Sequence, residues 1–415
     1  FWLQQSCIIV RASSCAAIRS SSVTMRIALF SWESLHSMAV GGLGVHVTEL
    51  AAALDRRGHE VHVFCRGGDR GGYEKIDGVH YHFVDAPGDE GNLVESMKTM
   101  CNNMMWAFGE TQDHVGRFDI ASAHDWMTTK ALVQVKNSHS IPCTFTLHST
   151  ESGRCLSSEG NQEIKDLEAE GAYVADKVIA VSGRFKGEVM GEYAVPESKC
   201  WVVPNGINVS RYDGMIDCAE VKGRYGIGCL DPMILFVGRM SGGLKGSDLI
   251  VEAMPSILGA HGSAKAVFVG DGDAKMHCDH RSKELGVDGS CRFLGAKRGQ
   301  ELADLYKACD VVVVPSRNEP FGLIVLEAWA AGKPVVVSDQ VGCPVTEWEQ
   351  GLVASCTPEG FAWGCIEIFN DFDRAREMGR KGRDKAAFEM SWDAAAAIQE
   401  ACFEDVLQWD RCLGA

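Results

Sequence analysis

Short apolar runs alternate with longer amphipathic segments along most of this chain of 415 residues. In the first half, the apolar runs predict strands at residues 27–31, 61–65, 120–123, 144–147, 178–181 and 201–203. In the second half, similar runs predict strands at residues 234–237, 266–269, 311–314 and 335–338. Helical spacing fills the segments between them, for example at residues 45–54 and 248–258. Because parallel strands need a crossover that is usually a helix, this alternation predicts an α/β protein with parallel sheets wound on both faces.

A polar seam divides this alternation into two parts. The seam starts at Pro204-Asn205-Gly206 and runs to about Asp231, and residues of this kind are typical of connections. We therefore expect one unit at residues 25–205 and a second at residues 206–390, followed by an amphipathic helix at residues 391–415. A chain of this length can form two domains of ordinary size, each with its own core.

Residues 317–332, which read R-N-E-P-F-G-L-I-V-L-E-A-W-A-A-G, are the most informative segment. They follow a predicted strand and should begin a helix, whose free backbone N–H groups form a site for an anion such as a phosphate. The expected helix start is formed by Phe321, Gly322, Leu323 and Ile324. Glu319 precedes it, and Glu327 lies about two turns into the helix. Two carboxylates around an anion site suit two hydroxyl-bearing groups that flank a diphosphate, as in a nucleotide-sugar.

A pair of cations lies upstream of this segment. Arg239 follows the predicted strand at residues 234–237, and Lys245 follows a glycine-rich loop. Two cations that leave neighbouring strand ends can clamp a pyrophosphate and stabilise the charge on a departing nucleoside diphosphate. In the first half, Gly42 and Gly44 would let the backbone approach the diphosphate from the opposite wall. That glycine loop lacks the third glycine of G-x-G-x-x-G, which argues against a dinucleotide oxidoreductase.

Two further candidates lie at predicted strand ends in the first half. His148 ends the strand at residues 144–147 and begins the loop H-S-T-E-S-G-R, a position suited to chemistry as well as to a structural hydrogen bond. Asp125 lies in H-D-W and either supports His148 or an acceptor hydroxyl, or caps a helix. The run H-C-D-H at residues 277–280 has no partner at zinc spacing. We interpret that run as surface and expect no metal site.

Taken together, these motifs resemble the donor site of retaining glycosyltransferases with the GT-B fold, especially the large family four. The match rests on R-x5-K at residues 239–245 together with E-P-F-G-L-x3-E at residues 319–327. Further similar motifs run through about residues 25–400, including G-G-L-G-V-H at 41–46, V-P-N-G-I at 203–207 and F-L-G at 293–295. The H-D-W and H-S-T-E-S-G-R segments are most similar to glycogen and starch synthases. Two departures are Ala39, where bacterial-type synthases carry lysine, and the segment V-G-C-P at residues 341–344.

The resemblance implies two Rossmann-like domains that face a cleft, with a last helix that crosses back to the N-terminal domain. It implies retaining transfer of a hexose, most simply glucose, from UDP-glucose or ADP-glucose to a glucan, without a cofactor. The expected catalytic residues are His148, Arg239, Lys245 and Glu319. The expected donor-binding residues are Gly42, Gly44, Arg239, Lys245, Gly295, Phe321, Gly322, Leu323, Ile324 and Glu327, with Asp125 on the acceptor side.

Two other functions stay open at this point. One is hexose transfer to a lipid or a small glycoside, which the apolar helix predicted at residues 93–108 would favour if it faced a membrane. Methionines at helical spacing, such as Met97, Met100 and Met104, more often belong to a core. The other is a catalytically weak regulator that binds sugar-nucleotide or glucan, suggested by the altered segment at residues 341–360. The intact cation and carboxylate pattern argues against a regulator.

Composition limits the partners and the compartment. A net charge of −16 argues against nucleic acid as a partner. The seventeen cysteines are scattered through apolar segments, as at Cys65, Cys143 and Cys309, which favours reduced thiols. No apolar run reaches the ~18 residues of a membrane span, so we expect a soluble protein. Residues 1–24 are rich in serine without acidic residues, which suggests a transit-peptide remnant or translated upstream sequence, and hence the plastid stroma or the cytoplasm.

Overall fold

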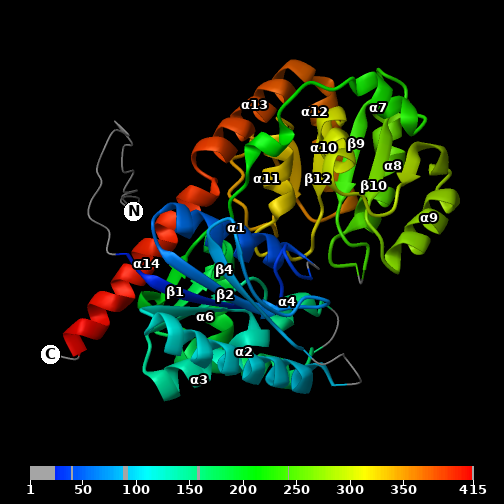
Figure 1. Ribbon diagram of the computed structural model, residues 1–415. Coiled ribbons are helices and arrows are strands. Elements are labelled where there is room, and N and C mark those ends of the chain that lie inside the picture. The colour runs from blue at the N-terminus through cyan, green and yellow to red at the C-terminus, as the bar shows by residue number, and fades with distance from the viewer. Residues whose placement is uncertain (1–23, 39–40, 87–91, 157–158, 242, 414–415) are drawn as a thin grey trace, which may run out of the picture.

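The computed structural model describes residues 24–38, 41–86, 92–156, 159–241 and 243–413 (Figure 1). The expectations about the serine-rich leader and about Ala39 lie outside these residues. The described chain forms two α/β halves, each built on its own sheet, and Figure 1 shows the first half below the second. The α/β fold class with two doubly wound sheets is therefore confirmed.

The first sheet has the strand order β3-β4-β2-β1-β5-β6-β7-β8. Its strands are β1 (Arg26–Ser31), β2 (Glu60–Arg66), β3 (Gly72–Ile76), β4 (Val79–Val84), β5 (Ile120–His124), β6 (Cys143–Leu147), β7 (Lys177–Ala180) and β8 (Cys200–Val202). All neighbours are parallel except β3 and β4. Ile27 and Leu29 join one apolar cluster while Ala28 and Phe30 join another, because β1 is covered on both faces. Burial on both faces explains why its sequence is continuously apolar.

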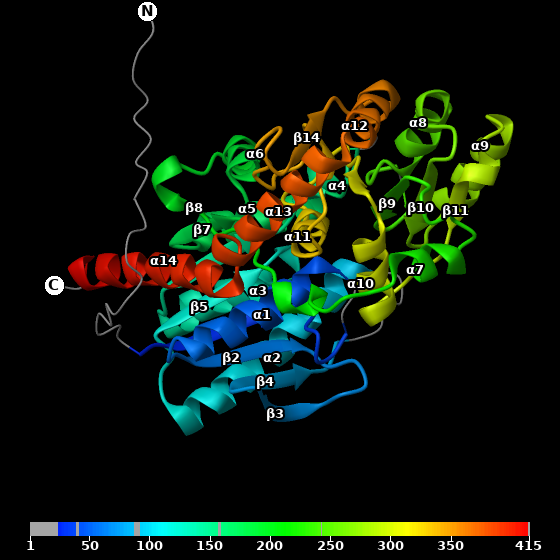
Figure 2. The same cartoon turned by 90° about the horizontal axis from the view of Figure 1, so that it is seen from above.

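Helices cover both faces of this sheet (Figures 1 and 2). They are α1 (Gly42–Arg56), α2 (Leu93–Val115), α3 (Thr129–Gln134), α4 (Glu151–Arg154), α5 (Gln162–Val174) and α6 (Gly183–Tyr193). In α2, Met97, Met100 and Met104 are buried in the same apolar cluster as Phe30. The methionine spacing of this helix therefore reflects core packing.

The second sheet is wholly parallel, in the order β11-β10-β9-β12-β13-β14. Its strands are β9 (Met233–Val237), β10 (Lys265–Val269), β11 (Cys291–Phe293), β12 (Val311–Val314), β13 (Val335–Ser338) and β14 (Gly351–Ala354). Its helices are α7 (Cys218–Arg224), α8 (Ser247–Ala260), α9 (Ala274–Glu284), α10 (Gly299–Ala308), α11 (Leu323–Ala330), α12 (Pro358–Asn370) and α13 (Phe372–Phe388). As on β1, alternate residues of β12 lie on opposite faces of the sheet and belong to two different apolar clusters.

The last helix, α14 (Trp392–Leu413), returns to the first half (Figure 2). It packs on α1, and its Trp392 and Phe403 are buried in the apolar cluster that contains Ile27. At the start of α14, the returning chain crosses the segment that first connected the two halves, at Gly206. A Cβ atom on Gly206 would lie 2.4 Å from the backbone nitrogen of Trp392, so only glycine fits this crossing.

The strands predicted from apolar runs are all present, within one residue at most ends. Four strands were not predicted: β3, β4, β11 and β14. Cys65, Cys143 and Cys309 are buried free thiols, as their apolar surroundings indicated. In the part of the chain that the structure describes, no helix is long and apolar enough to cross a membrane.

Candidate active site

The helix α11 begins directly after the loop that carries Glu319. Its N-cap is Gly322, whose φ of 100° lies in the left-handed region that favours glycine. No side chain caps this end of the helix, so its first N–H groups are available to an anion. The helix begins at Leu323 and not at Phe321, so Glu327 lies just over one turn into it. The expected depth of two turns was therefore wrong, because the loop extends through Gly322.

Glu319 and Lys245 meet beside this helix start. The ammonium nitrogen of Lys245 lies 2.6 Å from Oε2 of Glu319. The hydroxyl of Ser316 donates to the same oxygen at 3.3 Å. A carboxylate in contact with an ammonium group can bind a sugar hydroxyl and a phosphate oxygen that are neighbours in one ligand. The structure thus brings together two of the residues that the sequence singled out.

Arg239 lies next to this ion pair. The side chain of Lys245 runs past Gly238, where a Cβ atom would lie 3.9 Å from Cγ of Lys245. Arg239 follows Gly238 and is exposed. Among the described residues, no hydrogen bond or ion pair holds its guanidinium group. An exposed guanidinium group without a partner is available to bind a phosphate.

Gly295 belongs to a set of loops that pack together at the carboxyl edge of the second sheet. A side chain on Gly295 would lie 3.5 Å from the carboxylate of Asp271, in the turn after β10. In that turn, Cβ atoms on Gly270 and Gly272 would lie 1.9 and 2.3 Å from backbone oxygens of the Arg239 loop. Glycines therefore let the loops after β9, β10 and β11 form one layer around Arg239.

Glu327 is fixed by a neighbouring helix. The hydroxyl of Tyr306, on α10, donates to Oε2 of Glu327 at 2.6 Å. Burial raises the pKa of Glu327, while the hydrogen bond from Tyr306 and the charge of Arg211 oppose that shift. The carboxylate is thus held in one orientation inside the second half, close to the helix start that the sequence assigned to the donor.

The start of α1 forms the facing wall. A Cβ atom on Gly42 would lie only 3.0 Å from Cδ1 of Leu323, so the N-terminal ends of α1 and α11 meet across the two halves. The N–H groups of Gly41 and Gly44 donate to the buried carboxylate of Glu33, at 3.2 and 3.1 Å. Glu33 was not among the expected site residues. It holds the glycine loop in the conformation that faces α11.

His148 and Asp125 are joined through the backbone. The N–H group of His148 donates to Oδ1 of Asp125 at 2.7 Å. Asp125 makes no side-chain cap to the helical turn that follows it, and its φ of 59° is unusual for a residue other than glycine. The geometry therefore favours support of His148 over helix capping. Burial raises the pKa of Asp125 to about 6 and lowers the pKa of His148 to about 3.

Two further histidines surround His148. His124 Nδ1 lies 3.2 Å from His148 Nε2, and the ring of His46 stands edge-on to His148 at a centroid distance of 4.5 Å. His46 Nδ1 lies 2.6 Å from Oδ1 of Asn205. His46 and Asn205 were missed as site residues, although both lie in segments quoted for the resemblance. The expectation of no metal site also overlooked this group, because its three histidines come from separate parts of the chain.

The loop at residues 317–344 is tied to the first half. The hydroxyl of Ser182 donates to the backbone oxygen of Pro320 at 2.5 Å, and Arg184 donates to side-chain oxygens of Asn318 and Gln340. Gly342, in the altered V-G-C-P segment, donates to the backbone oxygen of Glu319 at 2.8 Å and leaves no room for a side chain. This segment therefore positions the loop that carries Glu319.

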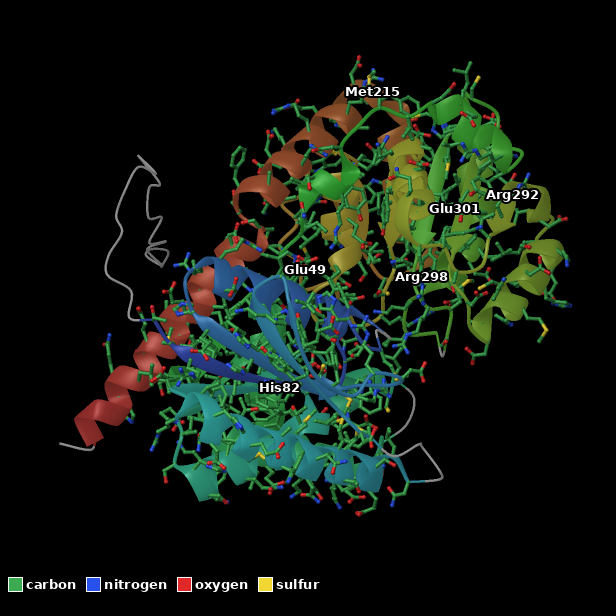
Figure 3. All side chains as sticks on the ribbon, viewed as in Figure 1. Glu49, His82, Met215, Arg292, Arg298 and Glu301 are labelled. Carbon is green, nitrogen blue, oxygen red and sulfur yellow. The ribbon has the colours of Figure 1, made fainter. Side chains whose placement is uncertain are left out.

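A second link between the halves lies on α1. Glu49, labelled in Figure 3, forms an ion pair with Arg211 in the connection between the halves. Arg211 also acts on Glu327 through its charge. The contact between Glu49 and Arg211 therefore connects the first half to the surroundings of Glu327.

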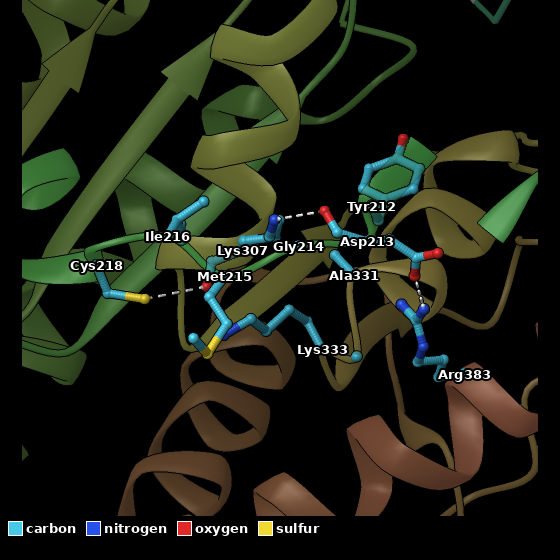
Figure 4. Close-up of a pocket in the computed structure, with 11 residues that line it drawn as sticks. Tyr212, Asp213, Gly214, Met215, Ile216, Cys218, Lys307, Ala331, Lys333 and Arg383 are labelled. Carbon is cyan, nitrogen blue, oxygen red and sulfur yellow. Dashed lines mark hydrogen bonds and ion pairs between the residues drawn. The ribbon is translucent and has the colours of Figure 1, made fainter. Parts of the chain in front are cut away.

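Two other features lie away from this site. In the H-C-D-H run on α9, His277 and His280 are exposed as expected, but Cys278 is buried against Ser247, because it faces α8. A pocket of about 420 Å³ lies at the far end of α11 (Figure 4). It is lined by Tyr212, Lys307, Lys333, Arg383 and their neighbours, and contains none of the expected site residues.

Comparison with known proteins decides the family. Residues 221–385 match the family described as Glycosyl transferases group 1, and residues 40–211 match Glycosyltransferase Family 4. An uncharacterised glycosyltransferase of Methanocaldococcus jannaschii is 36% identical over 380 residues, which cover 90% of this chain and 96% of that protein. The chain belongs to the group 1 glycosyltransferases.

More distant relatives of this glycosyltransferase differ in what their names say. A D-inositol 3-phosphate glycosyltransferase of Segniliparus rotundus is 28% identical over 407 residues, covering 93% of this chain and 90% of that protein. A glycogen synthase of Mycobacterium tuberculosis is 28% identical over 400 residues, covering 90% of this chain and 92% of that protein. These two relatives are equally similar to this chain.

Solved structures establish the GT-B fold of this glycosyltransferase. Sucrose-phosphate synthase of Thermosynechococcus elongatus has a TM-score of 0.77 at 23% identity, covering 92% of this chain and 99% of that one. The catalytic domain of starch synthase IV of Arabidopsis thaliana has a TM-score of 0.72 at 17% identity, covering 93% of this chain and 100% of that one. At these identities the likeness concerns the fold alone.

Proposed function

We propose that this glycosyltransferase is a retaining enzyme that moves glucose from UDP-glucose or ADP-glucose to an α-glucan chain. The Lys245–Glu319 ion pair carries the proposal. Lys245 is a cation that can bind a phosphate, and it lies 2.6 Å from Glu319, whose carboxylate can accept a hydrogen bond from a sugar hydroxyl. Both groups lie beside the uncapped start of α11. The backbone of the glycine loop at Gly42 lies opposite this point. The relationship to a glycogen synthase over 90% of the chain supports glucan as the acceptor.

In the proposed reaction, Arg239 and Lys245 bind the diphosphate, Glu319 binds hexose hydroxyls and Glu327 binds the ribose. The bond between the anomeric carbon and the phosphate oxygen breaks, and the two cations stabilise the charge on the leaving nucleoside diphosphate. The acceptor hydroxyl attacks the same face of the sugar. Its proton goes to an oxygen of the departing phosphate, so the configuration is retained. His148 contacts the sugar near the reacting carbon.

The proposed mechanism uses no nucleophile from the protein, no cofactor and no metal. A retaining hydrolase places its nucleophile about 5 Å from a second carboxyl group that acts as the acid. Here Glu319 is paired with Lys245, and Asp125 accepts from the backbone of His148, so each carboxylate already has a partner. Two cations and the starts of two helices supply the positive field that the leaving group needs.

A small glycosyl acceptor is the second candidate. The D-inositol 3-phosphate glycosyltransferase of Segniliparus rotundus is as similar to this chain as the glycogen synthase is. A lipid acceptor has less support, because the methionines of α2 are buried in the core. A catalytically weak regulator also has less support, because the Lys245–Glu319 pair and the exposed Arg239 are intact.

We also propose a reducing compartment, either the cytoplasm or the plastid stroma. Many cysteines are present as free thiols, and the described structure places most of them in the core. Such thiols persist in compartments where disulfides are kept reduced.

The test is transfer of labelled glucose from each donor to glycogen, to D-inositol 3-phosphate, or to a lipid extract. We expect glycogen to raise nucleoside diphosphate release and to become labelled. The label should then be released by a hydrolase specific for α-1,4 bonds, which establishes retention from the α-linked donor. Label only on inositol phosphate or lipid would contradict the glucan acceptor. Donor binding without transfer to any acceptor would point to a regulator.

A further inference from the structure

Three histidines form a compact group between the strands of the first half and α1. His46 lies on α1, His124 ends β5 and His148 follows β6. One ring nitrogen from each of them lies within 4.8 Å of those of the other two. His46 and His124 are each 1% exposed. A buried set of three imidazoles at this spacing is rare unless the rings share a ligand or a hydrogen-bond network.

Hydrogen bonds satisfy only some of the ring nitrogens in this group. A neutral imidazole has one N–H donor and one lone-pair nitrogen. His46 Nδ1 faces the carbonyl oxygen of Asn205 at 2.6 Å and therefore carries the hydrogen, so the lone pair is on Nε2. That Nε2 atom is buried and has no hydrogen-bond partner in the described chain. Buried polar atoms without partners are uncommon and need an explanation, such as a bound water molecule or ion.

The arrangement has the features of a transition-metal site. Imidazole nitrogen is the ligand that Zn²⁺, Cu²⁺, Ni²⁺ and Co²⁺ bind in proteins, and three histidines with an open fourth position form a known zinc arrangement. In such sites the second ring nitrogen usually donates to a carbonyl or carboxylate, which Asn205 provides for His46.

We propose that His46, His124 and His148 bind one divalent transition-metal ion of the zinc class, and that the bound ion inhibits the enzyme. His124 and His148 are already 3.2 Å apart, close to the separation of two ligands on one zinc ion. The ligand nitrogen of His46 lies within 4.8 Å of the other two, so the His46 ring must move closer to complete the set. The metal then occupies His148, which the proposed function assigns to the donor sugar, so transfer stops until a chelator removes the ion.

The inhibitory part rests on the proposed function, whereas binding does not. The experiment therefore begins with binding, on full-length protein without an affinity tag. Co²⁺ is the probe, because its visible absorption reports the number and type of its ligands. Cys218→Ser and Cys229→Ser form the background, since both thiols are exposed and thiolates bind the same metals. Calorimetry with Zn²⁺ gives the stoichiometry and the affinity.

Four variants distinguish the histidine group from other sites. His46→Gln and His124→Gln each remove one ligand, and Asn205→Ala removes the partner of His46 without removing a ligand. The matched control is His277→Gln with His280→Gln, which removes two exposed histidines on α9. Thermal unfolding of each variant shows which of them are folded, and any folded ligand variant suffices for the comparison.

We expect one equivalent of metal to bind in the background protein and in the α9 control. We expect binding to be lost in His46→Gln and His124→Gln and to weaken about 10–100-fold in Asn205→Ala, the usual effect of removing an outer partner. The Co²⁺ spectrum should lack thiolate charge-transfer bands. Zn²⁺ should abolish transfer reversibly in protein that is active. Absence of stoichiometric binding, or binding unchanged in His46→Gln and His124→Gln, would overturn the proposal. Metal binding without inhibition of an active enzyme would overturn its inhibitory part alone.

Discussion

The orientation of Glu327 depends on a single hydroxyl group. Tyr306 donates to its Oε2 atom at 2.6 Å, and no other residue of the described chain donates to that carboxylate. A carboxylate that binds the ribose of a donor must keep its orientation in both the ground state and the transition state. Loss of the Tyr306 hydroxyl should therefore weaken binding of the donor and of the transition state by equal amounts.

We predict that Tyr306→Phe raises KM for the donor about fivefold, which corresponds to the ~1 kcal/mol of one hydrogen bond, with kcat little changed. Steady-state kinetics with varied donor measures both constants. Tyr225→Phe is the control, because its hydroxyl donates to Glu301 on the exposed side of α10. A fall in kcat at constant KM would show that Glu327 acts on the chemical step.

The sequence predicted which candidate residues lie near one another where those residues share one short segment. Glu319, Gly322 and Glu327 share one strand-loop-helix unit, so their proximity follows from local structure. His46 and Asn205 are 159 positions apart, and their contact depends on how α1 packs against the connection between the halves. No local pattern contains that information, which is why both residues were missed.

At the scale of elements, the meeting of α1 and α11 depends on the small size of Gly42. Leu323 already lies 3.0 Å from the position of a Cβ atom there. A branched side chain at Gly42 would push the two helix starts apart, because both backbones are fixed by the sheets behind them.

We predict that Gly42→Val lowers kcat/KM at least about tenfold, and that Leu323→Ala in the same chain restores part of the loss by making space. Gly187→Val on α6 is the control, because a Cβ atom at Gly187 meets nothing within 4 Å. Initial rates of nucleoside diphosphate release measure the effect. If Leu323→Ala gave no recovery in the Gly42→Val protein, the contact between the helix starts would not be the cause of the loss.

The pairing of β2 and β4 buries a histidine whose titration affects stability. Burial lowers the pKa of His82 to about 3, with the nearby His62 and His80 as further causes, and His82 stacks on Phe64. Figure 3 labels His82 in the first half. The unfolded state therefore binds a proton near its ordinary pKa of about 6.5, while the folded state does not. His82 stabilises the fold fully above that value and progressively less as pH falls from about 6.5 towards 3.

We predict that His82→Phe reduces the loss of unfolding free energy between pH 7.5 and pH 5 by about 2 kcal/mol, because one fewer group titrates over some 1.5 pH units. Denaturant titrations at the two pH values measure this difference. His280→Gln on the exposed side of α9 should leave it unchanged. An equal pH dependence in His82→Phe and the unmodified protein would contradict the lowered pKa.

At the scale of elements, strongly buried strands were recognised from the sequence, and exposed ones were missed. β12, with the sequence V-V-V-V, is buried along its length and was recognised from its apolar run. β3 is exposed and has the sequence G-Y-E-K-I, so its identity as a strand depends on the hairpin it makes with β4. β11 (C-R-F) has an arginine at its centre and β14 (G-L-V-A) begins with a glycine, so neither shows the uninterrupted β-branched run that marks β12.

At the scale of the whole molecule, the end of the chain completes the core of its beginning. Phe403 on α14 is fully buried in the cluster that contains Ile27 and Leu29 of β1. Salt bridges from Arg57 and His59 to Glu400 lie along the same contact. The first half therefore cannot complete its core until the second half has been made and α14 has returned.

We predict that Phe403→Ala destabilises the first half by about 3–5 kcal/mol, the usual cost of an emptied aromatic site in a core. Trp409→Ala, on the same helix but 67% exposed, should change stability by less than about 0.5 kcal/mol. Urea unfolding measures both. A Phe403→Ala protein as stable as the Trp409→Ala protein would show that α14 is not part of that core.

The central claim is that Arg239, Lys245 and Glu319 form the donor site of this glycosyltransferase. The most direct measurement is nucleoside diphosphate release from UDP-glucose and ADP-glucose, with glycogen present, by the unmodified protein and by the Arg239→Ala, Lys245→Ala double variant. Arg376→Ala, which removes an exposed cation on α13, is the matched control. We predict loss of at least about 100-fold in kcat for the double variant, as when a donor to the developing charge is removed, and none in the control. A double variant that transfers glucose at the unmodified rate would contradict the account.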